Sequence, residues 1–345
     1  MLTVAMVGMG WHSWLFREEM RALLGDISIL HPRIVSYDIG QEEISKLSGA
    51  ALLDEVLILG GHSIFPESPE LQNSLCRTIG EWAIQNFERG DFAVRTRKIG
   101  ELPDTISSRS FEDKVGRVVS SNGIRVNLES PSNEIVIIIA GSNDGDTHPE
   151  PFEFEETMVV WGLRVKDWSK ESFSGRSPTE RPYFKPISLE PRQARLLISL
   201  SRVPNREIKA VVDPFCGTGG IAIEAVLQDI RALASDLDSR MVEGTKENLK
   251  WLGKECVVKK WDASDLSTLW GEREGCSFVF DPPYGRSSWR SVDSLDIFLS
   301  VLKEAKKIDA RGVVSTMLPA GPEALNSGNN DDIIVMGKKW SELLS

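Results

Sequence analysis

The chain has 345 residues, of which 41% are apolar and 26% charged, a composition that excludes a disordered or fibrous protein and allows two or three domains. The net charge of −11 argues against a surface that is basic throughout, although residues 160–209 hold 11 basic against 5 acidic side chains. No apolar run approaches the roughly 20 residues of a membrane span, and the four separate cysteines form no metal or redox motif, so we expect a cytoplasmic chain without a metal.

The N-terminal part of the chain predicts an α+β region, because short apolar strands are separated by stretches with helical spacing. The expected strands are Thr3–Val7, Ile34–Asp38, Glu55–Leu59, Asp91–Arg97, Arg125–Leu128 and Glu134–Ile139. The expected helices are Trp14–Leu24, Gln41–Leu47 and Leu71–Phe87. We expect residues 1–60 and 61–155 to form two small units that meet near Gly60 and Gly61, and residues 156–180 to form a linker.

Residues 181–345 have the pattern of a doubly wound α/β domain. The expected strands are Ala210–Asp213, Arg231–Ser235, Cys256–Val258, Ser277–Phe280, Gly312–Met317 and Ile333–Val335. The expected helices are Gly219–Gln228, Ser239–Leu252 and Ser294–Lys306. Because strands and helices alternate, we expect a mostly parallel, Rossmann-like sheet that binds its ligand at the carboxyl ends of the strands.

A glycine-rich turn, VVDPFCGTGG, follows the first of these strands. Glycines such as Gly217 and Gly219 permit a positive φ and let the backbone approach a ligand closely. The turn lacks the lysine of a phosphate loop, and Asp213 instead suits a cationic ligand such as the methionine end of S-adenosylmethionine. A strand–turn–helix corner that simply needs glycine is the alternative. The cofactor-binding residues expected here are Asp213, Pro214, Phe215, Gly217 and Gly219.

A second motif, DPPYG, ends a later strand and predicts methylation of an exocyclic amino group on a nucleic-acid base. Such an amine is a poor nucleophile, because its lone pair is delocalised into the ring, so it needs acceptors that hold its N–H bonds. We expect the Asp281 carboxylate and the Pro282 carbonyl to be these acceptors, and the base to stack on Tyr284. A stiff turn without chemistry is the alternative.

Acidic residues end the two strands between these motifs. Asp236 lies about 20 residues beyond the glycine turn, where an acid binds ribose hydroxyls in dinucleotide folds. Asp262 is expected to accept a hydrogen bond from an adenine amino group, with a turn or helix cap as the alternative, and Asp238 is interpreted as the cap of the next helix. Leu237 and Ala263, beside these acids, are expected to line the same pocket.

Together these motifs resemble the archaeal tRNA guanosine-10 N2-methyltransferases. The resemblance covers residues 181–289, from RPYFKPISLEPRQAR through DPFCGTGG, SDLD and WDA to DPPYGR. A weaker similarity extends to an N-terminal RNA-binding THUMP module. The resemblance implies a ferredoxin-like unit at residues 1–60, a THUMP domain at 61–155 and a class I S-adenosylmethionine-dependent methyltransferase domain at 181–345.

The resemblance also implies a reaction, in which one or two methyl groups pass from S-adenosylmethionine to N2 of guanosine 10 in tRNA. It implies that Asp281 holds the target amine, that Tyr284 faces the base, and that Phe184 helps to close the methionine end of the pocket. The implied RNA-binding residues are Arg95, Arg97, Lys98, Lys185, Arg192 and Arg286. Neither a metal nor a membrane is implied; a small activating subunit stays open, and without one we expect a monomer.

The chain departs from this family in two places. Its C-terminus, GKKWSELLS, lacks the usual basic ending, and residues 1–159 hold 25 acidic against 13 basic side chains. Two other interpretations therefore stay open: an amino-methyltransferase acting on rRNA or on adenine in DNA, and a non-catalytic RNA-binding factor that keeps the fold.

Overall fold

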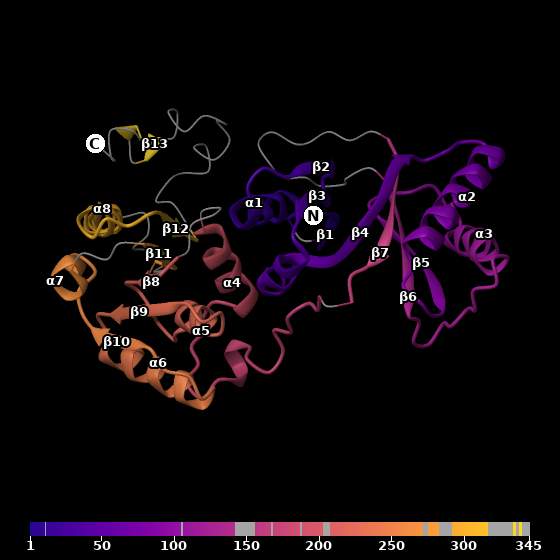
Figure 1. The fold of residues 1–345 in the computed structure, drawn as a ribbon. Helices are drawn as coiled ribbons and strands as arrows, with labels where there is room; N and C mark the ends of the chain where they lie inside the picture. Colours follow the sequence, from indigo (N-terminus) through magenta and orange to yellow (C-terminus); the bar gives the residue numbers. More distant parts are fainter. Residues whose placement is uncertain are drawn as a thin grey trace. The chain divides into compact units, whose positions relative to one another are not determined.

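The computed structural model describes residues 1–10, 12–104, 106–141, 156–166, 168–186, 188–202, 208–271, 275–282, 292–316, 334–335 and 338–339. They form two compact units (Figure 1). The first comprises residues 1–17, 26–48 and 52–170, and the second comprises residues 18–25, 49–51 and 171–345. Within the described residues, no helix has the length and apolar character to cross a membrane.

The first unit contains a seven-stranded sheet in the order β2-β3-β1-β4-β7-β6-β5. Its strands are β1 (Leu2–Gly8), β2 (Ser28–His31), β3 (Ile34–Ile39), β4 (Leu53–Ile64), β5 (Phe92–Ile99), β6 (Asn133–Ala140) and β7 (Met158–Arg164). β5 and β6 are parallel, and the other neighbours are antiparallel. The helical segments are α1 (Ser13–Leu24), the 3₁₀ segment η1 (Gln41–Gly49), α2 (Pro69–Asn86) and α3 (Ser108–Ser120).

The sheet of this unit is buried on both faces, which explains the unbroken apolar run of β6. Ile135, Ile137 and Ile139 pack in one cluster with side chains of α2 and α3, whereas Val136 and Ile138 pack in a second cluster. Side chains alternate between the faces of a strand, so a strand that is covered on both sides is apolar throughout. Figure 1 shows α2 and α3 together beside β5 and β6.

The domain boundaries in this region differ from those expected from the sequence. The boundary near Gly60 and Gly61 falls inside β4, and these glycines instead make room for the Trp161 indole: a Cβ at Gly60 would lie 2.6 Å from its Cδ1 atom. The expected linker, residues 156–180, contains β7, which pairs with β4 and β6. The strand expected at Arg125–Leu128 is reduced to one isolated bridge between Phe92 and Val126.

The second unit contains a five-stranded sheet, with all its pairs parallel, in the order β10-β9-β8-β11-β12. The prediction of a mostly parallel sheet is therefore confirmed. The strands are β8 (Ala210–Asp213), β9 (Arg231–Asp236), β10 (Val257–Lys260), β11 (Cys276–Phe280) and β12 (Val313–Ser315). The helices are the short 3₁₀ turn η2 (Pro178–Glu180), α4 (Pro191–Leu200), α5 (Gly220–Val226), α6 (Ser239–Trp251), α7 (Leu266–Trp270) and α8 (Val292–Lys307).

The last expected strand, Ile333–Val335, does not extend this parallel sheet. It corresponds to β13 (Ile334–Val335), which pairs antiparallel with β14 (Lys338–Lys339) in a separate two-stranded sheet. A short apolar stretch fits a hairpin as well as a sheet strand, so its pattern alone did not distinguish the two.

Candidate functional site

A cavity of about 630 Å³ lies at the carboxyl ends of β8, β9 and β11. β8 comes first along the chain and has β9 on one side and β11 on the other, so the loops that leave these strands diverge and open a crevice. The sequence-predicted residues that line the cavity are Asp213, Pro214, Phe215, Gly217, Asp236, Leu237, Asp262, Ala263, Asp281 and Pro282. The glycine turn and Asp281 with Pro282 therefore bound one and the same cavity.

The glycine turn adopts a backbone that only glycine tolerates easily. Gly217 has a φ of 53° and Gly219 a φ of 87°, and a Cβ on Gly219 would lie 2.8 Å from Cγ2 of Thr245. The Gly217 N–H donates to Oδ2 of Asp236 at 3.0 Å, and the Thr245 hydroxyl donates to the Gly217 carbonyl at 2.9 Å. Gly219 itself is the N-cap of α5 and not one of the residues that line the cavity.

Asp213 is a buried acid in the wall of this cavity, 2% exposed. Its Oδ1 accepts the N–H of Phe215 at 3.1 Å. Burial raises the pKa of the Asp213 carboxyl well above its ordinary value, and the negative charges of Asp236 and Asp281 raise it further. A positively charged ligand would relieve both effects, so the site is suited to a cation.

The other acids at the strand ends play distinct parts. Asp236 accepts the Asp238 N–H at 2.9 Å as well as that of Gly217, and burial raises its pKa. Asp238 caps α6 as expected, and its hydrogen bonds with Arg240 lower its pKa to about 2. Asp262 accepts both the N–H and the hydroxyl of Ser264, which lower its pKa.

Asp281 stands at the end of β11, immediately after Phe280. The Thr316 hydroxyl, beyond β12, donates to Oδ1 of Asp281 and so fixes the orientation of the carboxylate. The Phe280 ring beneath it packs against Phe215 and Phe298, with ring centroids 5.7 and 5.9 Å apart. Tyr284 and Arg286, the other residues predicted in this motif, lie outside the described residues.

The segment 181–186, which we call the strap, is held on α6 by a buried amide that sequence reasoning did not single out. Asn248 accepts the Tyr183 N–H at 2.9 Å and donates to the carbonyls of Tyr183 and Thr218 at 2.8 and 2.9 Å. A Cβ on Gly244 would lie 2.0 Å from Cδ1 of Tyr183, so the ring rests directly on the helix. Phe184, expected to help close the methionine end of the pocket, is 42% exposed and is not among the described residues that line the cavity.

Two hydroxyls beside the strap complete this wall of the cavity. Thr218 donates to Oγ of Ser188 at 2.8 Å, and both residues line the cavity. Lys185 lies over the Tyr183 ring, 5.4 Å from its centroid, and Arg192 donates to the Ala51 carbonyl at 2.9 Å. Thr218 lies within the glycine turn, but no local pattern marks Ser188 as a pocket residue, since it acts through a contact distant in sequence.

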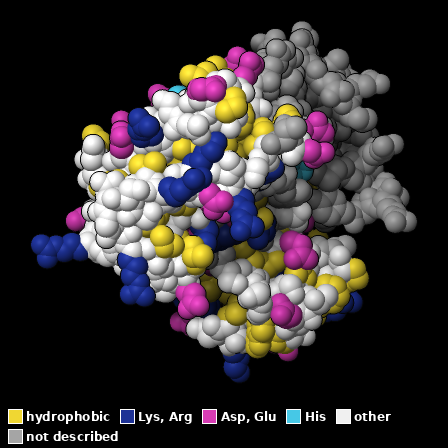
Figure 2. Space-filling view, turned by 90° about the vertical axis from the view of Figure 1, so that its right-hand side faces the viewer, with side chains coloured by type: hydrophobic (Ala, Val, Ile, Leu, Met, Phe, Trp, Pro, Cys, Tyr) yellow, Lys and Arg dark blue, Asp and Glu magenta, His cyan; other side chains and the backbone are white. Residues whose placement is uncertain are grey.

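The basic residues expected on the first unit already have partners within the protein. Arg97 pairs with the carboxylates of Asp54, at 2.8 Å, and Glu55. Arg95 and Lys98 each donate to a backbone carbonyl. On the face drawn in Figure 2, Lys and Arg side chains gather near the middle with Asp and Glu among them. The contacts of Arg95, Arg97 and Lys98 within the protein therefore stabilise the first unit.

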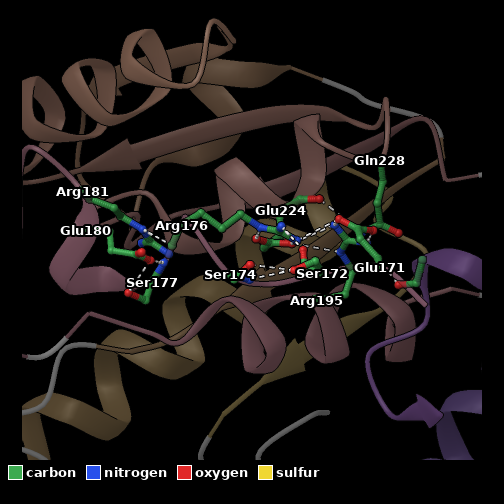
Figure 3. Close-up of polar contacts among 11 residues, drawn as sticks. Glu171, Ser172, Ser174, Arg176, Ser177, Glu180, Arg181, Arg195, Glu224 and Gln228 are labelled. Atoms are coloured by element: carbon green, nitrogen blue, oxygen red, sulfur yellow. Dashed lines mark hydrogen bonds and ion pairs between the residues drawn. The ribbon is translucent and has the colours of Figure 1, made fainter. Parts of the chain in front are cut away.

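A network of charged side chains is buried next to the helix that follows the glycine turn (Figure 3). Glu224 of α5 is fully buried, and its carboxylate accepts from Arg176 at 2.7 Å and from Arg195 at 2.8 Å. Both arginines also pair with Glu171. The Phe173 ring lies 4.9 Å from the Arg176 guanidinium carbon and 5.7 Å from that of Arg195. The network ties residues 171–176 and α4 to α5.

Comparison with known proteins matches residues 178–330 to the family described as RMKL-like, methyltransferase domain. A tRNA (guanine(10)-N2)-dimethyltransferase of Pyrococcus abyssi is 29% identical over 77% of this chain and 73% of its own length. That of Methanothermobacter thermautotrophicus is 36% identical over 60% of this chain and 55% of its own length. A probable tRNA (guanine(10)-N2)-dimethyltransferase of Methanothermococcus thermolithotrophicus is 35% identical over 33% of this chain and 73% of its own length.

Proposed function

Because this chain belongs to the family of tRNA (guanine(10)-N2)-methyltransferases, we propose that it transfers one or two methyl groups from S-adenosylmethionine to the exocyclic N2 of guanosine 10 in tRNA. The observation that carries this proposal is the single cavity bounded by both the glycine turn and Asp281 with Pro282. A non-catalytic factor that binds the cofactor would need the glycine turn alone. Methyl transfer also needs the acceptors of Asp281 and Pro282 beside the cofactor.

The cavity fits S-adenosylmethionine on the chemistry of its walls. When bound, this cofactor supplies a methyl group on a positively charged sulfur. Asp213 lines the space, and burial disfavours its ionised form until a cation such as the sulfonium or the amine is near. We assign the ribose hydroxyls to Asp236 and the adenine amino group to Asp262.

Asp281 and Pro282 would act on the substrate amine. The Asp281 carboxylate accepts a hydrogen bond from an N–H of the guanine N2. This hydrogen bond directs the nitrogen lone pair at the methyl carbon and stabilises the positive charge that develops on nitrogen. The proline ring at position 282 has no N–H to compete for this carboxylate, while its carbonyl provides a second acceptor. The base must leave its stack to reach these acceptors, and Tyr284 is our proposed stacking partner for it.

Cofactor binding is expected to release a proton from Asp213. The raised pKa keeps part of this carboxyl protonated at a pH above the ordinary value of 3.8, and a bound cation favours the ionised form. Affinity for S-adenosylmethionine should therefore rise with pH through the raised pKa of Asp213 and level off above it. Calorimetry in two buffers of different ionisation enthalpy measures the proton count. Asp213→Asn should abolish the release, and an unchanged proton count in that variant would remove Asp213 from this role.

For the substrate, we propose that the first unit is an RNA-binding region that includes a THUMP module, and that a cytoplasmic tRNA is the partner. The 25 acidic side chains of residues 1–159 limit this contact to a small basic area. Lys185, Arg192 and Arg286 would add basic contacts from the second unit. Two of the three cations expected on β5 have a described ion pair, and Arg95, with 40% of its side chain exposed, is more accessible than Arg97, with 34%.

Arg95→Gln is expected to weaken tRNA binding. It should also reduce the steepness of the fall of log affinity with log salt concentration by about one. Glu134 keeps its ion pair with Arg164 in this variant, so no carboxylate is left alone. The measurement is a filter-binding titration at several salt concentrations. Lys246→Gln on α6, which removes an exposed surface pair, is the control. An unchanged slope in Arg95→Gln would take Arg95 out of the RNA interface.

The proposed function is tested by methyl transfer from labelled S-adenosylmethionine to unmodified tRNA transcripts, followed by nuclease digestion and mass mapping. N2-methylguanosine or its dimethyl form at position 10 is the expected product, and a transcript with adenosine at position 10 is the matched control. Label at another nucleotide would overturn the assigned position. Absence of transfer to any RNA by protein that binds the cofactor would overturn the assigned reaction.

A further inference from the structure

Arg181, at the start of the strap, is a buried cation with unused hydrogen-bond donors. Its side chain is 4% exposed, and its Nε donates to the Arg176 carbonyl at 3.1 Å. Among the residues that the structure describes, neither Nη1 nor Nη2 has a hydrogen-bond partner. A buried polar group without a partner costs free energy, and a buried charge costs more. The position is therefore unfavourable unless another group supplies a countercharge.

No described carboxylate forms a hydrogen bond with Nη1 or Nη2 of Arg181. Glu224 is shared between Arg176 and Arg195, as Figure 3 shows, with Arg181 on the opposite side of Arg176. Burial lowers the pKa of Arg181, and Arg176 lowers it further against the opposing effects of Glu224 and Glu190. Glu224 and Glu190 therefore act on Arg181 through their charge alone, and its two Nη groups have no hydrogen-bond acceptor among the described residues.

The Arg181 guanidinium lies behind one wall of the cavity. Nη1 of Arg181 is 3.7 Å from the position that a Cβ on Gly220 would occupy, and Gly220 lines the cavity. Residue 220 has no side chain between the guanidinium and the cavity, and Leu189, whose carbonyl oxygen is 3.3 Å from the same Cβ position, forms the wall beside it. Ser188 and Thr218 line the same region, and the Ser188 hydroxyl, which accepts from Thr218, offers its own hydrogen to an anion. The acids Asp213, Asp236 and Asp281 supply the opposite charge elsewhere on the wall.

We propose that Arg181 is a specificity-determining residue that recognises the carboxylate of the cofactor's amino-acid end, acting across Gly220. The cofactor carries a cationic sulfur, a cationic amine and an anionic carboxylate. Its cationic groups match the acids on one part of the cavity wall, and its carboxylate matches the buried arginine behind another part. Arg181 attracts the carboxylate by its charge, and the Ser188 hydroxyl, which accepts from Thr218, donates to it. This inference rests on the proposed function, because it assumes that S-adenosylmethionine is the ligand.

The test compares S-adenosylmethionine with decarboxylated S-adenosylmethionine, which keeps the sulfonium, amine and adenosine but lacks the carboxylate. Calorimetric dissociation constants are measured for the full chain and for Arg181→Gln, Arg181→Lys and Gly220→Ala. The unchanged chain should prefer the ligand with the carboxylate. Arg181→Gln should reduce that preference about tenfold, and Arg181→Lys should restore most of it, because it keeps the charge. Gly220→Ala, which leaves Arg181 in place, should reduce the preference as well.

The ratio of the two constants separates recognition from a structural role, since loosened packing would weaken both ligands alike. Should Arg181→Gln not fold, Gly220→Ala supplies the same comparison in a chain with an intact charge network. An unchanged ratio in Arg181→Gln and Gly220→Ala, with S-adenosylmethionine still bound, would overturn the inference alone. Failure of the unchanged chain to bind S-adenosylmethionine would overturn the proposed function and this inference with it.

Discussion

Asp281→Ala is expected to lower the rate constant of methyl transfer about a thousandfold while S-adenosylmethionine binds nearly as before. The carboxylate at the end of β11 is the acceptor proposed to hold the target amine, and the interaction strengthens as positive charge develops on nitrogen. Single-turnover transfer to tRNA measures the chemical step, and calorimetry measures cofactor affinity in the same preparation. Loss of Asp281 also lowers the negative charge near Asp213, so the pKa of Asp213 should fall in this variant.

Thr316→Val provides the matched comparison for Asp281→Ala. This substitution removes the hydroxyl that donates to Oδ1 of Asp281 but leaves the carboxylate in place. Because Thr316 only orients the acceptor, we expect a loss of about tenfold in rate, well short of that in Asp281→Ala. Full activity in Asp281→Ala would exclude the proposed role, and so would a loss of activity that merely follows a loss of cofactor binding.

Gly217, Gly219 and Asp281 could be predicted from sequence because each depends on a local relation. The two glycines adopt positive φ in a turn between β8 and α5, and that turn is visible as an apolar strand followed by glycines. Asp281 ends an apolar strand, and the carboxyl ends of parallel strands meet at one edge of a sheet. Strand order then brings it to the same cavity as the glycine turn.

Gly60 and Arg97 show where local patterns fail. Two consecutive glycines are typical of a break between domains. Position 60 instead requires glycine because the indole of Trp161 on β7, about a hundred residues later, packs against it. A run of cations on β5 is typical of an RNA contact, but Arg97 pairs with carboxylates of β4, which β6 and β7 separate from β5 in the sheet. Both features depend on contacts between residues far apart in the chain, which no pattern within a single element records.

Helix α3 was missed for a related reason. Its apolar residues Phe111, Val115 and Val119 recur at intervals of four and are all buried, but polar residues fill the rest of the helix and lower its apparent hydrophobicity. Its N-cap, Ser107, accepts the Ser110 N–H, which is a start signal that a search for caps would have found. Asn248 carried no such signal, since a polar residue on a helix usually faces solvent.

Glu224→Gln should lower the free energy of unfolding by about 3–5 kcal/mol, the usual effect of removing one partner from a buried ion pair. Glu224 and Arg195 are both fully buried, so water does not replace the lost carboxylate, and Glu171 alone is left to balance Arg176 and Arg195. Urea denaturation followed by circular dichroism measures the change. Glu243→Gln on α6, which loses only a surface pair with Lys246, should be nearly neutral.

A double variant distinguishes lost pairing from a general loss of packing. Arg195→Met with Glu224→Met removes both charges and should destabilise the protein by less than the sum of the two single changes, because neither charge is then left buried alone. Additive effects would show that Glu224 and Arg195 do not stabilise each other. Since α5 begins directly after Gly219, coupling between these residues means that the buried pair also holds the glycine turn in place. Glu224→Gln should then weaken S-adenosylmethionine binding even at temperatures where the variant is fully folded.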